Sequence, residues 1–310
     1  MNFAPSLPQA RTRWRQSLYP YLLLALASLL WAGNWIVGRA VRDAMPPLAL
    51  TFWRWAVAAL LLAPVALPRL AGKGAVLRRH WRLLFLLGLS GVALFQAFVY
   101  TGLRYTTSVN GVLMNSAAPL FIILVARLLD GTRVTARQLL GIALSFLGIL
   151  LIMNRGDLAN LQRFSFNPGD IIILLGMPAW GVYCVLVRRR PAELDSLALI
   201  FVIASIGAAI LAPFYALESV FFATPRLGWG SAGGVLYIAG FASIAAYLCW
   251  NRGVELVGPN RAGFTIPLLP AFGTALAMIT LGEAVHLYHL LGIATIFAGV
   301  WLAISARRMA

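Results

Sequence analysis

The sequence is poor in charge, and in acidic residues above all. Only 11% of its 310 residues are Asp, Glu, Lys or Arg, and only 9 are acidic, whereas 61% are hydrophobic and the mean hydropathy is +0.85. An ordinary soluble domain has about a quarter of its residues charged, because its surface faces water. These proportions exclude a soluble enzyme, a disordered regulator and a secreted disulfide scaffold. They indicate that lipid surrounds most of the chain.

Cysteine and histidine are also scarce. The two cysteines, Cys184 and Cys249, lie in apolar runs, where we expect small core side chains rather than a disulfide or metal ligands. His286 and His289 fall in a short predicted loop, where we expect them at the membrane interface. No metal and no cofactor is therefore expected. No apolar run combines a nucleophile with a base, which disfavours a membrane-embedded transferase or protease.

The net charge of +16 permits two interpretations. A basic protein binds nucleic acid when its charge gathers on one face, but here Lys and Arg are scattered in short segments between apolar runs. If both termini and the even-numbered connections are placed on one side, that side holds about three times as many Lys and Arg residues as the other, which is typical of cytoplasmic loops. We therefore expect no nucleic-acid partner and a multi-pass membrane protein with both termini in the cytoplasm.

Ten apolar runs are long enough to cross a membrane, for which about 20 residues are needed. They cover residues 20–39, 48–68, 82–102, 107–129, 136–153, 169–188, 196–216, 231–252, 260–281 and 287–307. The connections between them are too short to hold a soluble domain. The sequence therefore predicts an all-α integral membrane protein with ten transmembrane helices, whose function lies among the helices.

The second half of the chain repeats the first. A shift of 151 residues superposes the segment LLGIA at 139–143 on the same segment at 290–294, and a shift of 149 superposes Trp31 on Trp180. Each half holds five predicted spans, an odd number, so the second half crosses the membrane in the opposite sense. Such inverted repeats let two halves open a central site to either side in turn. A duplication kept only for packing is the alternative.

This repeat defines the predicted domain organisation around a central cavity. We predict a basic cytoplasmic tail at 1–19, a first five-helix repeat at 20–153, an extracytoplasmic linker at 154–168 and a second five-helix repeat at 169–307.

Several features of the sequence resemble those of a known protein family. The features are Arg54 in the second span, Leu281-Gly282-Glu283, Leu290-Leu291-Gly292, Gly299 and the doubled five-helix unit. Over essentially the whole chain they resemble EamA-type members of the drug/metabolite transporter superfamily, and within it the bacterial exporters of amino acids, aromatic ones especially. The resemblance implies a carrier of small metabolites in the bacterial inner (plasma) membrane, and no enzyme. One position departs from the pattern, because the counterpart of Glu283 in the first half is Thr132.

Prolines inside two predicted spans indicate broken helices. Pro119 and Pro270 are superposed by the same shift of 151 residues, and Pro267 lies one turn before Pro270. A proline frees the carbonyl four residues before it, and in lipid that carbonyl needs protein or water as a partner. Broken helices at matching positions of two halves indicate a transport site near the midplane. A packing kink without a ligand is the alternative.

Polar and aromatic residues share single helix faces at spacings of three or four residues. The predicted cavity residues are Trp31, Asn34, Trp35, Gln96, Tyr100, Asn115, Trp180, Tyr183, Tyr247, Trp250 and Asn251. An amide in hydrocarbon needs partners, so these amides are expected to face inward. The aromatic rings could stack on an apolar or aromatic substrate, although core packing or an interfacial belt is the alternative for each ring alone.

Arg54 is predicted about six residues inside the outer end of the second span, whereas other basic residues lie at span ends or in loops. We expect either a guanidinium that snorkels to the outer interface or a cation in the outer vestibule that attracts a substrate carboxylate.

The acidic residues all lie in loops or at span ends, with Asp170 and Glu283 at span edges. Proton or sodium relays normally place a carboxylate near the midplane, so we expect export down the substrate's own gradient, with coupling through Asp170 or Glu283 as the alternative. Gly141 with Gly148, and Gly292 with Gly299, indicate close helix packing in spans five and ten, either inside the chain or in a homodimer.

The expected function is export of small metabolites, amino acids with aromatic or apolar side chains first, by alternating access. The partners are this substrate and the lipid bilayer. A multidrug or nucleotide-sugar-like carrier is the alternative within the same class, and a membrane-embedded enzyme is the third hypothesis.

Overall fold

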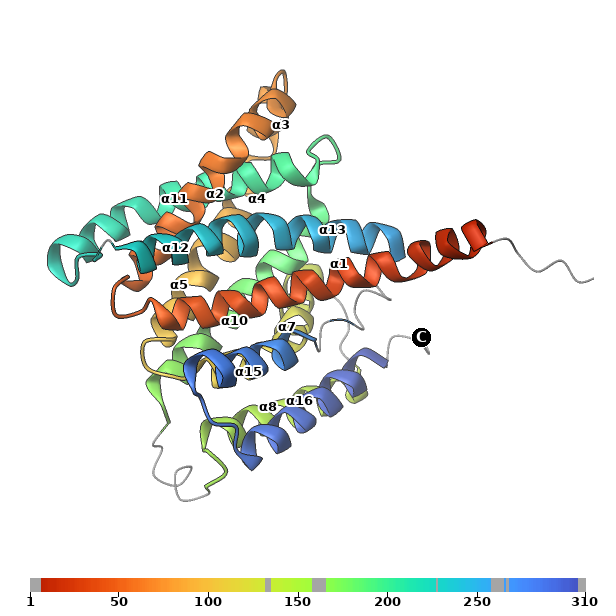
Figure 1. The fold of residues 1–310 in the computed structure, drawn as a ribbon, viewed down its shortest axis with the longest axis vertical. Coiled ribbons are helices and arrows are strands. Elements are labelled where there is room, and N and C mark those ends of the chain that lie inside the picture. Colours follow the sequence, from red (N-terminus) through yellow and green to blue (C-terminus); the bar gives the residue numbers. More distant parts are fainter. Residues whose placement is uncertain are drawn as a thin grey trace, which may run out of the picture.

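The computed structural model describes residues 7–131, 135–157, 166–226, 228–257, 265 and 268–305. Every regular element among them is helical (Figure 1). The elements are α1 (Leu7–Ala40), α2 (Pro47–Leu70), α3 (Gly74–Arg79), α4 (Trp81–Leu87), η1 (Gly88–Leu94), α5 (Phe95–Gly102), α6 (Ser108–Asn115), α7 (Ala118–Asp130), α8 (Ala136–Met153), α10 (Pro168–Leu186), η2 (Val187–Arg189), α11 (Ser196–Phe221), α12 (Trp229–Tyr237), η3 (Ile238–Ala245), α13 (Ala246–Val257), α15 (Leu268–Leu281) and α16 (Leu287–Ser305). The all-α prediction is confirmed for these residues.

The number of spans is confirmed only in part. Seven helical stretches of the described chain are long and apolar enough to cross a membrane, and the bent pair α6 and α7 makes an eighth. The predicted ninth and tenth spans correspond to α15 and α16, which are shorter apolar helices. Ten spans therefore stay a prediction.

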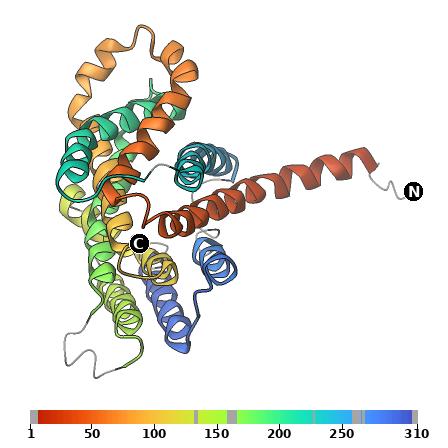
Figure 2. The same cartoon turned by 60° about the vertical axis from the view of Figure 1, so that its left-hand side comes forward.

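The first helix starts earlier than predicted. The tail expected at 1–19 is already helical from Leu7, and α1 continues through Pro20 to Ala40. Its first turns extend away from the rest of the molecule (Figure 2). Apolar composition predicted the membrane stretch but not the start, because a helix can continue into a polar segment once its first turns have formed.

The packing of the helices follows the repeat. The pair α1 and α13 has its counterpart in α10 and α5, and the pair α1 and α15 has its counterpart in α10 and α7. The remaining large contacts, α2 with α11 and α8 with α16, join helices that are counterparts of each other. The π-helical turns η1 and η3 are also counterparts of each other, and they interrupt the third and eighth predicted spans. This pattern supports a two-fold relation between the halves.

The glycines of the predicted fifth and tenth spans let these two helices approach each other closely within the chain. A Cβ atom on Gly148 would lie 2.6 Å from the carbonyl oxygen of Gly292, and one on Gly299 would overlap the backbone of Gly141. Ser145 Oγ donates a hydrogen bond to the carbonyl of Ile296 across the same contact, at 3.1 Å. Figure 1 shows the resulting pair α8 and α16 side by side.

The bundle has two ends, which contacts between segments distant in sequence define. At the tail end, where α1 enters the bundle, Lys73 Nζ donates to the carbonyl of Glu193, and Arg69 pairs with Asp195. At the far end, the backbone N–H of Arg226 donates to the carbonyl of Ala44. We use these two names below.

Buried apolar side chains form two large clusters. One joins α1 and α5 to α8 with α10, and the other joins α2 and α4 with α10 and α11. Trp180 packs against both clusters. Trp180 therefore lies at the boundary between the two clusters.

Candidate functional site

A cavity of about 730 Å³ lies between the two halves. Residues of α1, α2, α5, α6 and α7 line it from the first half, and residues of α10, η2, α11, α13 and α15 line it from the second. Every predicted cavity residue except Tyr100 is among the lining residues. The structure therefore brings ten of the eleven predicted residues to one cavity, and their role in binding substrate stays a prediction.

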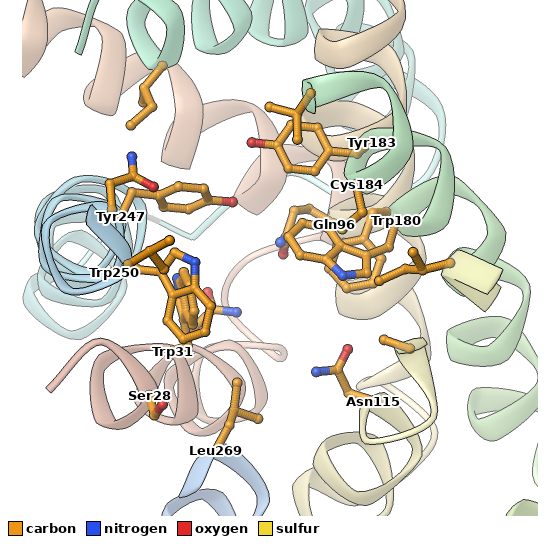
Figure 3. A pocket seen from close by; sticks show the side chains of 18 of the residues that line it. Ser28, Trp31, Gln96, Asn115, Trp180, Tyr183, Cys184, Tyr247, Trp250 and Leu269 are labelled. Atoms are coloured by element: carbon orange, nitrogen blue, oxygen red, sulfur yellow. The ribbon is translucent and has the colours of Figure 1, made fainter. Parts of the chain in front are cut away.

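One wall of the cavity is an aromatic cluster from α1 and α13. The ring of Trp31 meets Tyr247 edge-on, with 5.5 Å between centroids, and lies 5.4 Å from the ring of Trp250. The indole N–H of Trp31 donates to the carbonyl of Ala242 at 3.1 Å, which fixes the orientation of the ring. Figure 3 shows these three rings on one side of the cavity.

The opposite wall is an aromatic cluster from α5 and α10. The ring of Trp180 lies 4.9 Å from Phe95 and stacks on Tyr183 with 5.1 Å between centroids. Trp180 and Tyr183 face the first wall in Figure 3. Phe95 was not predicted, although it precedes Gln96 and so begins the same inward-facing stretch of α5.

The two walls are counterparts in the repeat. Trp31 and Trp180 are superposed by a shift of 149 residues, and Gln96 and Tyr247 by a shift of 151. Each wall combines a helix of one half with a helix of the other. A flat apolar group between the walls would therefore contact both halves at once.

Arg54 lies deep in the cavity rather than at an exposed vestibule or the interface. Its side chain is 1% exposed and lines the cavity from α2. Its Nε atom donates to Ser243 Oγ at 2.7 Å. The expectation of a snorkelling side chain is wrong, because protein covers the guanidinium and gives its Nε and Nη1 atoms local acceptors.

The remaining hydrogen bonds of Arg54 are made to three residues of the first half. Its Nη1 atom lies 3.1 Å from Asn34 Oδ1, 2.8 Å from Gln96 Oε1 and 2.9 Å from Tyr100 Oη. Tyr100 Oη in turn donates to Asn34 Oδ1 at 2.6 Å. Tyr100 therefore lies behind the cavity surface and holds Asn34 and Arg54 in place.

Ser243 is a site residue that the sequence did not reveal. It lies in the π-helical turn η3, where its hydroxyl donates to the carbonyl of Ile238 at 2.9 Å and accepts from Arg54. π-Helical turns occur frequently at functional sites. A single serine in an apolar run offers no pattern from which this contact could be predicted.

The predicted helix break at Pro119 is present. Helix α6 ends at Asn115, α7 begins at Ala118, and the two helices are bent by 44°. Pro119 occupies the first turn of α7, where a missing N–H costs nothing. Pro270 likewise lies in the first turn of α15, and Pro267 lies outside the described residues.

The cavity opens at the tail end of the bundle. Arg188, Arg190 and Ser196 line it there, and all three are partly or fully exposed. Arg188 Nη2 pairs with Asp130 Oδ2 at 3.2 Å, and Arg189 pairs with the same carboxylate. These are exposed ion pairs, which contribute little to stability and weaken with salt.

At the far end, two carboxylates of the second half bind the starts of helices of the first half. Glu218 accepts from the backbone N–H groups of Leu48 and Ala49 at the start of α2, at 3.2 and 2.8 Å. Glu283 accepts from those of Ser108 and Val109 at the start of α6, both at 2.9 Å. Helix N-termini favour negative charge, so both carboxylates hold the halves together.

A buried polar cluster adds to this closure. Asp170 accepts from Thr106 Oγ1, and Asn110 Nδ2 lies 3.2 Å from its Oδ2 atom. His289 Nε2 lies 2.9 Å from Asn110 Oδ1. His289 is 3% exposed and not at an interface as expected, because this cluster encloses it.

The titratable side chains of the described residues do not gather into a metal site. No group of three or more His, Cys, Asp or Glu side chains that could hold a metal ion occurs in the described part of the chain.

Comparison with known proteins identifies this architecture. The EamA-like transporter family matches residues 18–154 and again residues 167–305, which together cover most of the chain. The chain belongs to the EamA-like transporter family. The two matches coincide with the two predicted five-helix repeats. An EamA-like chain is a multi-pass membrane transporter and not an enzyme.

Full-length relatives of this EamA-like chain are transporters by name. The uncharacterized transporter YyaM of Bacillus subtilis is 26% identical over 93% of this chain and 94% of its own length. An uncharacterized transporter of Archaeoglobus fulgidus is 30% identical over 91% of this chain and 96% of its own length. A protein of Streptantibioticus cattleyicolor named "Probable terminal-alkyne amino-acid exporter" is 24% identical over 90% of this chain and 91% of its own length.

The fold is shared with a protein of known crystal structure. It superposes with a TM-score of 0.57 and 20% sequence identity, and the match covers 94% of this chain and 99% of the other.

Proposed function

We propose that this EamA-like chain exports small metabolites with an aromatic or apolar body, amino acids first, by alternating access. The observation that carries the proposal is the cavity between two aromatic walls, each built from both halves and joined by the Arg54 network. A ring would stack between the walls, and a carboxylate would reach Arg54. The exporter of terminal-alkyne amino acids among the relatives is consistent with this substrate class.

The proposed cycle uses ten spans arranged as inverted repeats. The structure has the cavity open at the tail end and closed at the far end. With both termini in the cytoplasm, as the charge bias predicts, this is the state that loads substrate from inside the cell. The bacterial inner membrane as location is part of the same proposal.

We infer that the substrate's own gradient drives export. Among the described residues that line the cavity there is no carboxylate to carry a coupling proton or sodium ion. Asp170 and Glu283 lie at the far end, outside the cavity, and bind the protein itself.

A homodimer through α8 and α16 remains part of the proposal, with one restriction. Their glycine faces are occupied by each other, so a second copy would pack on their outer faces, where Leu140, Leu147 and Leu291 are exposed.

The test is export from cells and from reconstituted vesicles. Trp180→Ala should lower the export rate of labelled aromatic amino acids about tenfold or more without lowering membrane abundance, because one wall loses its largest ring. Leu175→Ala, on the exposed face of the same helix, is the matched control. Normal flux with Trp180→Ala would place the substrate elsewhere, and transport of drugs or nucleotide sugars in preference to amino acids would favour the alternative carriers.

A further inference from the structure

The charge distribution in the cavity is one-sided. The proposed site contains a buried guanidinium, that of Arg54, whose four hydrogen-bond partners are all neutral. The described residues give no acceptor to its Nη2 atom, although the side chain is 1% exposed and lines the cavity. A buried cation without a counter-charge is unfavourable, so this position favours an anion.

The amides beside Arg54 add donors rather than acceptors. Arg54 Nη1 approaches the oxygen atoms of Asn34 and Gln96, which fixes the orientation of both amides. Their NH₂ groups have no acceptor among the described residues, and both side chains line the cavity. Around Arg54 the cavity therefore presents hydrogen-bond donors, which a carboxylate can use and an ammonium cannot.

Among the described residues that line the cavity, no acidic side chain balances this group. Helix α11, the counterpart of α2 in the repeat, contains neither Lys nor Arg, so the cation is present in one half only. Among the described lining residues the other charged side chains are Arg188 and Arg190 at the mouth. An ammonium group would meet only neutral acceptors such as the amides of Asn115 and Asn251, and it would be repelled by Arg54.

We propose that the cavity is selective for organic monoanions: an aromatic or apolar body next to a carboxylate, without a free ammonium group, binds more tightly than the zwitterion or the cation of the same shape. N-acylated amino acids and aryl carboxylic acids belong to this class. The proposal rests on the proposed function, because it uses the same cavity, and it narrows the substrate from amino acids to their anionic relatives.

The test uses four probes that share the phenylalanine side chain and carry different charges. N-acetyl-L-phenylalanine is an anion, L-phenylalanine a zwitterion, L-phenylalaninamide a cation and N-acetyl-L-phenylalaninamide neutral. Binding to the purified full chain is measured by calorimetry, which avoids passive leakage of the probes through vesicles. We expect N-acetyl-L-phenylalanine to bind about tenfold or more tightly than L-phenylalanine, and each carboxylate about tenfold or more tightly than its amide.

Two variants examine the role of the guanidinium. Arg54→Gln should abolish the advantage of carboxylates over amides. Because the loss of Arg54 disturbs its hydrogen-bond network, the affinities of the four probes are compared with one another within this variant. They are not compared with the affinities of the parent. Asn34→Asp keeps the shape and the acceptor that Arg54 and Tyr100 use, and adds the missing negative charge. This variant should shift the preference about tenfold or more towards L-phenylalaninamide.

The outcomes separate this proposal from the proposed function. L-Phenylalanine binding as tightly as N-acetyl-L-phenylalanine, or unchanged probe ratios with Asn34→Asp, would overturn the anion selectivity and leave an amino-acid exporter. Loss of L-phenylalanine binding with Glu255→Gln, next to Val254 in α13, would reveal a carboxylate for the ammonium and would also overturn it. No binding of any of the four probes would overturn both.

Discussion

The closure of the far end depends on a carboxylate that can be changed without altering its shape. Glu283 binds the backbone N–H groups of Ser108 and Val109, both at 2.9 Å, and its side chain is 11% exposed. Arg39 Nε lies 3.9 Å from the same carboxylate. In Glu283→Gln one oxygen remains as an acceptor, but the charge is lost and an NH₂ group faces a backbone N–H. We expect this variant to favour opening of the far end.

The magnitude follows from the contacts. A hydrogen bond to a charged group contributes about 1.5–3 kcal/mol, and a negative charge at a helix N-terminus about 0.3–1 kcal/mol. Part of this is retained by the amide oxygen, so the closed state should lose about 1–3 kcal/mol. That corresponds to a change of about 5- to 150-fold in the ratio of closed to open molecules.

The assay is modification of a cysteine in the cavity by a membrane-impermeant maleimide added outside whole cells. Asn115→Cys, in a chain whose natural cysteines Cys184 and Cys249 are replaced by serine, reports access through the far end. Glu283→Gln should raise the modification rate about 5- to 150-fold, whereas Glu193→Gln, in a loop at the tail end, should leave it unchanged. Equal rates in all three proteins would refute the role of Glu283 in closure, and rapid labelling of the parent would refute a closed far end.

Three further predictions follow from the same structure. Tyr100→Phe removes the hydroxyl that donates to Asn34 and accepts from Arg54, so it should lower the free energy of unfolding by about 1–3 kcal/mol in thermal unfolding. Tyr105→Phe, on an exposed ring, should change the free energy of unfolding by less than about 0.5 kcal/mol. Gly148→Ala forces the backbones of α8 and α16 apart and should lower stability by about 1–3 kcal/mol, while Gly233→Ala, with nothing within 4 Å, should not. Collapse of the pH gradient should leave the initial export rate from loaded vesicles unchanged, and a rate that follows the gradient would indicate proton coupling.

The helical faces of the cavity could be predicted because each is local. Trp31 and Asn34, or Trp180 and Tyr183, lie three residues apart on one helix, and a helix in lipid turns its polar groups inward. The same rule predicted Tyr100 as a cavity residue, but its side chain lies one layer behind the cavity surface. Spacing gives the direction of a side chain but not the depth at which a second helix covers it.

The surroundings of Arg54 could not be predicted because they join four segments distant in sequence. Asn34, Gln96 and Ser243 come from α1, α5 and η3, and only the packing of these elements brings them to one guanidinium. Snorkelling was a reasonable expectation for an arginine near the end of a span. It fails here because local acceptors were available inside the bundle.

The burial of His289 was missed for a related reason. A histidine next to a loop normally faces the interface, and nothing in its own helix indicates Asn110 or Asp170 as neighbours. The pairing joins α16 to α6 and α10. A contact between halves leaves no periodic signal in either half.

The contacts between the halves differ in strength at the two ends of the bundle, and this difference bears on the proposed cycle. Glu218 and Glu283 bind helix starts at the far end, whereas the pairs of Asp130 with Arg188 and Arg189 at the tail end are exposed and weak in salt. An empty chain is therefore expected to rest with its cavity open at the tail end.

Export requires the opposite state, and a ligand shifts such an equilibrium only through contacts that it makes better in one state. A ring held between Trp31 and Trp180 contacts both halves, so the substrate itself can supply the closing contact at the tail end. Substrate should then slow modification of Ser196→Cys at the mouth, and an unchanged rate would show that binding and closure are separate events.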